Sequence, residues 1–163
     1  METDRVDDIL AQWQRERPDL DSSPMGIIGR ISRLERHFDR ELQATFTRFG
    51  LQRGEFDVLA SLRRAGPPYQ LTPTALYSTL MLSSGAMTNR LDRLEQAGLV
   101  QRANDPRDRR GILVGLTAQG QALIDDAVAA HVLNEQRLLT QLTQSERQAL
   151  AALLRRLLRS LEE

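Results

Sequence analysis

One short polar run carries groups that can contact both the bases and the phosphates of nucleic acid. Hydroxyls, an amide and a guanidinium occur together in the segment Ser83-Ser84-Gly85-Ala86-Met87-Thr88-Asn89-Arg90. Such groups bond to base edges in the major groove and to phosphate oxygens of the backbone. Helix capping is the plainer interpretation of Ser83 and Ser84, although one of them can cap while the other faces phosphate.

A second run, DPRDRR at residues 105–110, concentrates arginine. Four of its charged residues, Arg107, Asp108, Arg109 and Arg110, are candidates for DNA contact. Alone, such a hexamer is usually a solvated turn. Here it lies between two short apolar segments and directly after a capped helix, so the context favours a DNA-binding hairpin.

A third group has the chemistry of an anion site. Asp57 and Arg64 are two helical turns apart and share one helix face, and Arg102 follows on a predicted strand. The two guanidiniums and the carboxylate can hold a planar anion by fork-type hydrogen bonds, with Trp13 as a flat apolar wall. The alternative is a structural salt bridge between Asp57 and Arg64, with Trp13 packed in the core.

The elements that must position these residues follow from caps and apolar spacing. The pattern predicts a first helix that Thr3 or Asp4 can cap and that runs to about Arg17. It predicts further helices from residues 22–24 to Gly50 and over residues 52–65, 72–79 and 83–98. Residues 99–116 alternate like strands and predict a two-stranded hairpin. Thr117 then caps a long helix, and the capping box Thr143-Gln144-Ser145-Glu146 opens a last one.

The predicted fold class is mainly α with a small β-hairpin wing, the layout of a winged helix-turn-helix. A helix with a small polar start fits a major groove of about 12 Å, while a basic hairpin can reach the adjacent minor groove. The last helix carries a wide leucine stripe, which indicates burial against a partner chain as well as its own core.

The segment LSSGAMTNRLDRLEQAGLVQRANDPRDRRGILVGLTAQGQAL resembles the core signature of the MarR family of transcription regulators. The resemblance implies a single domain over residues 1–163, in which residues 1–50 and 118–163 form an intertwined homodimer and residues 51–117 bind DNA. It also implies that Asp108 and Arg110 structure the wing, with Arg110 reaching the minor groove.

The third group resembles a smaller branch of that family, the urate-responsive regulators, which have an extra N-terminal helix bearing tryptophan. Asp57, Arg64 and Arg102 match the branch at equal separations, and Trp13 is the tryptophan of the first helix. The resemblance implies urate or a related purine as effector, and aromatic carboxylates stay open as the alternative.

Composition excludes several classes of function. With no cysteine and two histidines, His37 and His131, the chain has no disulfides, no thiolate metal cluster and no rich metal site. It shows no nucleophile-base pairing or Gly-rich phosphate loop, so we expect neither an enzyme nor a bound cofactor. The acidic start and the lack of a long apolar stretch predict a cytoplasmic protein without membrane contact.

All 22 basic residues are arginine, and residues 51–120 hold nine of them against six acids, a net charge of +3. Arginine suits fork-shaped contacts to phosphate, carboxylate and guanine. The sequence therefore predicts a ligand-responsive regulator, a repressor that binds a palindromic operator in double-stranded DNA and is released by a small anionic effector. The alternative is a helical dimerisation module without sequence-specific DNA binding.

Overall fold

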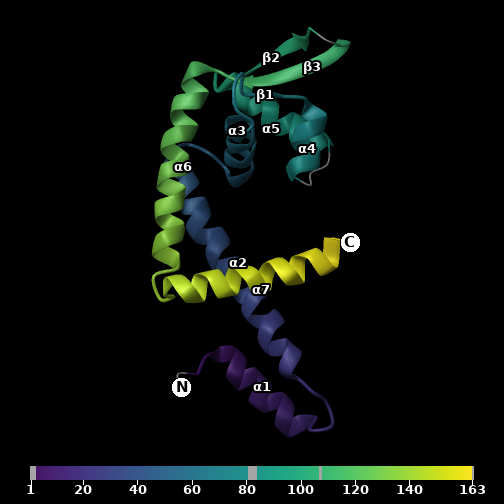
Figure 1. The fold of residues 1–163 in the computed structure, drawn as a ribbon, viewed down its shortest axis with the longest axis vertical. Helices are drawn as coiled ribbons and strands as arrows, with labels where there is room; N and C mark the ends of the chain where they lie inside the picture. Colours follow the sequence, from purple (N-terminus) through teal and green to yellow (C-terminus); the bar gives the residue numbers. More distant parts are fainter. Residues whose placement is uncertain (1–2, 81–83, 107, 163) are drawn as a thin grey trace. The chain divides into compact units, whose positions relative to one another are not determined.

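The computed structural model describes residues 3–80, 84–106 and 108–162. Contacts within the chain divide it into two compact units, residues 1–41 and 42–163. Figure 1 draws the helices and strands of both units.

The first unit contains α1 (Arg5–Glu16) and most of α2 (Ser23–Thr47). As expected, Asp4 caps α1: its carboxylate accepts from the amides of Val6 and Asp7, and Asp7 Oδ2 accepts from the amide of Asp4. Arg30 of α2 donates to both carboxylates, to Asp4 at 2.9 Å and to Asp7 at 2.7 Å. These bonds join α1 to α2.

The two helices of this unit bury little. Val6 is buried, but Ile9, Met25 and Ile28 line an apolar hollow of about 440 Å³ and stay largely exposed. Exposed apolar surface of this kind is typical of interaction sites.

The second unit is built around α3 (Arg53–Arg64), α4 (Pro73–Leu80) and α5 (Ser84–Gln96). Strands β2 (Val100–Asp105) and β3 (Asp108–Leu116) follow, and α6 (Ala118–Leu138) packs against α3. The helix order and the hairpin confirm the predicted mainly α, winged helix-turn-helix class.

The sheet has one strand more than predicted. A two-residue strand, β1 (Gln70–Leu71), pairs antiparallel with Gly115 and Val114 of β3, so the strand order is β1-β3-β2. The hairpin strands also extend further into the polar segment than expected, to Asp105 on one side and from Asp108 on the other. The predicted two-stranded hairpin is confirmed as β2–β3, whereas β1 was not predicted, because so short a strand has no periodicity of its own.

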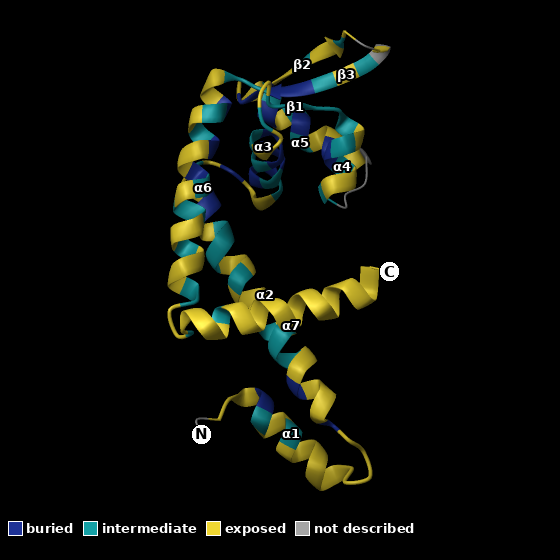
Figure 2. Cartoon of the chain, viewed as in Figure 1, coloured by how far each residue is buried: buried dark blue, intermediate teal, exposed yellow. Residues whose placement is uncertain are grey.

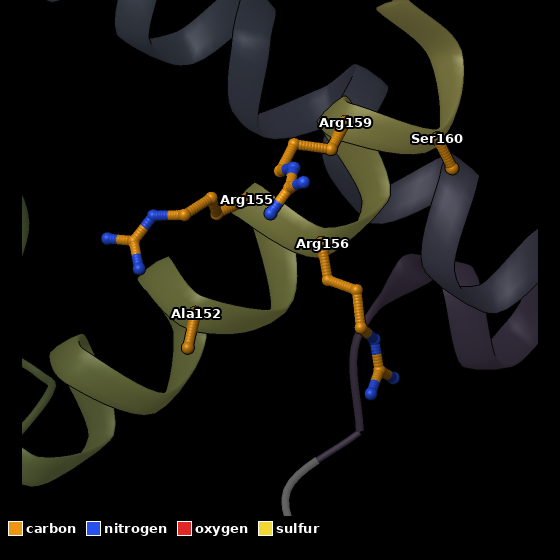
Figure 3. A pocket seen from close by; sticks show the side chains of 5 residues that line it. All are labelled: Ala152, Arg155, Arg156, Arg159 and Ser160. Carbon is orange, nitrogen blue, oxygen red and sulfur yellow. The ribbon is translucent and has the colours of Figure 1, made fainter. Parts of the chain in front are cut away.

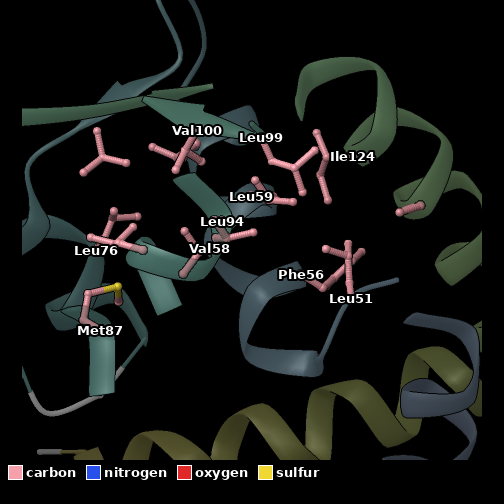
Figure 4. Packing of buried hydrophobic residues seen from close by; sticks show 14 of the residues in the cluster. Leu51, Phe56, Val58, Leu59, Leu76, Met87, Leu94, Leu99, Val100 and Ile124 are labelled. Carbon is pink, nitrogen blue, oxygen red and sulfur yellow. The ribbon is translucent and has the colours of Figure 1, made fainter. Parts of the chain in front are cut away.

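One hydrophobic core holds this unit together (Figure 4). Each helix and long strand of the winged region contributes to it, including Leu59, Leu76, Leu94 and Val114, and α6 adds Ile124. Burying side chains of this size contributes about 1.5–3 kcal/mol each. The core therefore fixes α5 and the wing strands on α3.

The last helix, α7 (Gln144–Glu162), contrasts with the core. The Thr143–Glu146 capping box forms as predicted, since Glu146 Oε2 accepts from the amide of Thr143 at 2.7 Å. None of the described residues of α7 is buried, and its six leucines are 40–77% exposed (Figure 2).

Candidate nucleic-acid interface

The helix α5 divides into a buried face and an exposed ridge. Met87, Leu91 and Leu94 recur at helical spacing and are all buried. Thr88 and Asn89, on the other side, are exposed. This ridge presents a hydroxyl and an amide, the groups expected to meet base edges.

Met87 corrects the predicted set of DNA-contacting residues. Its side chain is 1% exposed and packs in the core with Leu76 and Leu91. It therefore holds α5 in place and cannot reach a groove. The i, i+4 and i+7 spacing of Met87, Leu91 and Leu94 already carried this signal.

Arg90 lies against α3. A Cβ built on Gly54 would lie 2.2 Å from the guanidinium carbon of Arg90, so the Arg90 side chain passes directly over this glycine, and a larger residue at position 54 would displace its flexible end. Arg90 thus covers the first turn of α3 and lies beside the exposed ridge of α5, where it was predicted to contact DNA.

On the same flank of α5, Arg93 pairs with a buried acid of α3. Arg93 Nε donates to Glu55 Oε1 at 2.7 Å, and Glu55 is 7% exposed. The sequence analysis did not single out this pair, because 38 residues separate the partners and no local pattern joins them.

On the other flank, Arg102 of β2 holds α5. Its guanidinium donates to Asp92 at 2.6 Å and to Glu95 at 2.5 Å, and its amide donates to Glu95 at 3.0 Å. The hydrogen bond to Asp92 raises the pKa of Arg102 further above its ordinary value. Arg102, predicted as a ligand residue, therefore also ties the wing to α5.

The wing is the β2–β3 hairpin. The register shifts between Asn104 and Asp105, and Asp108 opens β3 opposite Asp105. Arg109 and Arg110 follow on β3, and Ser84 begins α5. Ser83 and Arg107, both predicted to contact DNA, lie outside the described residues.

Asp57, the predicted acid of the ligand group, is half-buried on α3. Burial raises the pKa of its carboxyl above the ordinary value, although positive charge from Arg53 and Arg90 lowers it. Among the described residues, no hydrogen bond or ion pair is made by the Asp57 carboxylate. Keeping a partly desolvated carboxylate without such a partner costs free energy, which is typical of functional sites.

Arg64 and Trp13 complete the predicted ligand group. Arg64 is exposed and donates to the hydroxyl of Ser61 at 3.3 Å. In the part of the chain that the structure describes, it forms no salt bridge with Asp57, so the purely structural interpretation of that pair is not supported. Trp13 lies on α1 in the first unit, 41% exposed. The ligand group as a whole stays a prediction.

One residue near Asp57 was not predicted for the site. His131 of α6 packs on the rings of Phe46 and Phe56, with centroid distances of 5.4 and 5.0 Å, and it lies close enough to Asp57 to lower the pKa of that carboxyl. Its Nε2 lies 3.2 Å from Glu135, while its buried Nδ1 has no partner among the described residues. The apolar spacing of its helix had indicated only an ordinary helix-face histidine.

Arginine also gathers on α7, away from its leucines. Arg155, Arg156 and Arg159 project around a hollow of about 310 Å³ whose lining comes from this helix alone (Figure 3). Helical spacing places them opposite Leu150, Leu154 and Leu157. α7 thus presents a charged face and an apolar face.

No helix in the described parts of the chain is long and apolar enough to cross a membrane.

The comparisons with known proteins agree with this geometry. A model described as "MarR family" matches residues 49–111. The chain is 45% identical over 151 residues to the HTH-type transcriptional regulator PecS of Dickeya dadantii, covering 93% of this chain and 91% of PecS. It is 36% identical over 107 residues to the multiple antibiotic resistance protein MarR of Escherichia coli, covering 66% of this chain and 70% of MarR.

The chain belongs to the MarR family. A solved structure of a mutant MarR from E. coli complexed with operator DNA matches it with a TM-score of 0.72 and 30% identity, covering 96% of this chain and 99% of that one.

The MarR-family chain is a DNA-binding transcription regulator. Regulators of this family are not enzymes. The sequence-based predictions of a DNA-binding regulator and of a non-enzymatic protein are therefore confirmed at the level of the family. The alternative of a dimerisation module without DNA binding is set aside.

Proposed function

We propose that this MarR-family chain is a ligand-responsive repressor that binds a pseudo-palindromic operator as a homodimer. Residues 51–117 bind the DNA, and residues 1–50 and 118–163 form the dimer. Residues 83–90 enter the major groove without using the Met87 side chain, and the arginines of the wing reach the adjacent minor groove.

The exposed ridge of α5 is the observation that carries this proposal. Thr88 and Asn89 face outward, while the charged side chains of Arg93, Asp92 and Glu95 are held by neighbouring elements. A rigid helix with a polar, uncharged ridge suits direct contact with base edges. A MarR of E. coli with the same fold has been solved in complex with operator DNA, which supports DNA binding by this chain.

The dimer is supported by apolar surface that the single chain leaves uncovered. The leucines of α7 and the isoleucines at the start of α2 are mostly exposed, although a stable fold buries such side chains. In a homodimer with a two-fold axis, each copy covers the apolar faces of the other. Two reading helices related in this way require two half-sites about one helical turn, or 10 bp, apart.

The effector is a small planar anion held by Trp13, Asp57, Arg64 and Arg102. The likeness to PecS extends over 93% of this chain, which fits the resemblance to the urate-responsive branch. Urate or a related purine is therefore the first choice, and an aromatic carboxylate the second.

Release follows from competition at Arg102. An anion that binds its guanidinium competes with Asp92 and Glu95, the two acids through which Arg102 holds α5. The ligand thus favours a second arrangement of the reading helix, with a coupling of about 1–3 kcal/mol for an effector of this kind.

Titration with urate, xanthine and salicylate tests the effector site. Trp13 is the single tryptophan, so its fluorescence reports binding directly, and operator release is followed in parallel. We expect Arg64→Ala to bind operator normally but to lose ligand-induced release. The matched control is Arg63→Ala, whose guanidinium pairs with Asp125 of α6 instead, and this variant should release DNA as the parent does.

The site is refuted if none of the three compounds changes the fluorescence and Arg64→Ala releases DNA like the parent. In that case the four residues are scaffolding.

A further inference from the structure

Glu55 is an acid in a place where acids are rare. It lies in the first turn of α3, 7% exposed, between the buried Phe56 and the capping residue Gln52. Glutamate is seldom this deeply buried unless both its oxygens are satisfied. Two groups satisfy the oxygens of the Glu55 carboxylate.

Each oxygen of Glu55 serves a different element. Oε2 accepts from the amide of Gln52 at 2.8 Å and so caps α3. Oε1 accepts from Nε of Arg93 on α5 at 2.7 Å. The bond to Gln52 already restricts the Glu55 side chain, so pairing with Arg93 costs little additional conformational entropy of Glu55.

The pair acts on the rotation of α5 about its own axis. Arg93 is one turn beyond Asn89, on the side of the helix that faces α3. The opposite flank is held by Arg102 through Asp92 and Glu95. The core holds α5 against the rest of the unit, while the ion pairs on its two flanks, one on the α3 side and two on the Arg102 side, oppose rotation of the helix in either direction.

We propose that Glu55 is a positioning residue for DNA reading: through Arg93 it sets the rotation at which α5 presents Thr88 and Asn89 to the bases. The inference rests on the proposed role of α5 as the reading helix. It predicts that loss of the ion pair blurs discrimination among sequences, because a turned helix still meets phosphates but no longer aligns its ridge with base edges.

Glu55→Gln is the test variant, because its amide oxygen still caps Gln52 while the ion pair is lost. Binding is measured by fluorescence anisotropy on a selected operator and on random DNA of equal length and salt. We expect about tenfold weaker operator binding. Affinity for random DNA should change by less than about twofold, since phosphate contacts dominate it.

The matched control is Asp125→Asn. It breaks an ion pair of the same length, 2.7 Å, which joins Arg63 of α3 to Asp125 of α6 and does not involve α5. This variant should keep the parent's ratio of operator to random affinity. The double variant Glu55→Gln, Arg93→Gln completes a cycle, in which the second change should add little to the operator loss caused by the first.

The proposal is overturned if folded Glu55→Gln keeps the parent's operator affinity, or if both DNAs lose affinity equally. If Glu55→Gln does not fold, Arg93→Gln answers the same question, since the Arg93 side chain is half-exposed and its loss leaves the α3 cap intact. A parent protein that does not distinguish operator from random DNA would instead refute the proposed function.

Discussion

At the scale of single residues, the charged side chains of α5 contact neighbouring elements and hold the helix in place, while Thr88 and Asn89 lie on its exposed side. Arg93 is bound by Glu55, Arg90 covers Gly54, and Asp92 and Glu95 share Arg102. Asp57 differs from all of them, since among the described residues its carboxylate has no direct partner. A ligand that donates a hydrogen bond to this carboxylate would therefore supply a partner that the described residues do not.

Asp57→Asn should stabilise the protein at neutral pH. Burial raises the carboxyl pKa in the folded state above the ordinary 3.8, so ionisation costs stability above the folded-state pKa. The cost fades as pH falls through that pKa and is absent once both states are protonated. We therefore expect thermal melts to show a gain of a few degrees at pH 7 that shrinks toward pH 4.

Asp126→Asn, on the exposed side of α6, is the matched control and should show no such gain. A variant of Asp57 that is less stable than the parent at pH 7 would mean that the carboxylate is held by favourable contacts and carries no such cost.

Asn89→Ala should change which sequences the protein prefers. Asparagine pairs with adenine through two hydrogen bonds, and one such pair contributes about 1–3 kcal/mol of discrimination. Binding to operator variants substituted one base pair at a time should therefore become indifferent at one position in each half-site. Equal weakening on every variant and on random DNA would show that Asn89 reads no base.

At the scale of elements, the sequence predicted what local rules determine. Asp4 at α1, Thr117 at α6 and the Thr143–Glu146 box at α7 each cap the helix they were expected to cap. Features that depend on distant partners were missed. β1 exists because β3 offers it an edge, and Glu55 is buried because Arg93 lies within reach.

In the candidate nucleic-acid interface too, the features set by local sequence were predictable and those that depend on distant partners were not. The polar ridge of α5 followed from residue types alone, and Met87 could have been placed in the core from its spacing with Leu91 and Leu94. The partners of Arg102 could not have been predicted, because a strand and a helix must first be packed together before their charges meet.

The junction between β2 and α6 depends on Gly120. A Cβ at this position would lie 1.9 Å from the backbone oxygen of Leu99, which also accepts from the amide of Thr117. Gly120→Ala must displace this backbone, and overpacking typically costs about 1–3 kcal/mol. We expect urea unfolding to show at least that loss.

Gly85→Ala is the control, because nothing lies near its added Cβ. It should not lower stability, since alanine is the better helix former. Equal stability of the two variants would contradict the close approach at Leu99.

At the scale of the whole molecule, a MarR-family winged helix is combined with helices that we propose form a two-fold dimer. The winged region has a complete core of its own, whereas the leucines of α7 and the hollow beside α1 lack a cover within their units. In the proposed homodimer, symmetry links the assembly to the DNA, because two copies of α5 related by a two-fold axis would contact two copies of one half-site.

Selection from a random double-stranded DNA library tests this central claim most directly. The full-length protein is used at moderate salt, and the bound pool is sequenced after several rounds. We expect one enriched inverted repeat whose half-sites lie about 10 bp apart, and we expect Asn89→Ala to lose the preference at its most sharply selected positions. Enrichment of no sequence, or of a single half-site without a symmetric partner, would contradict it.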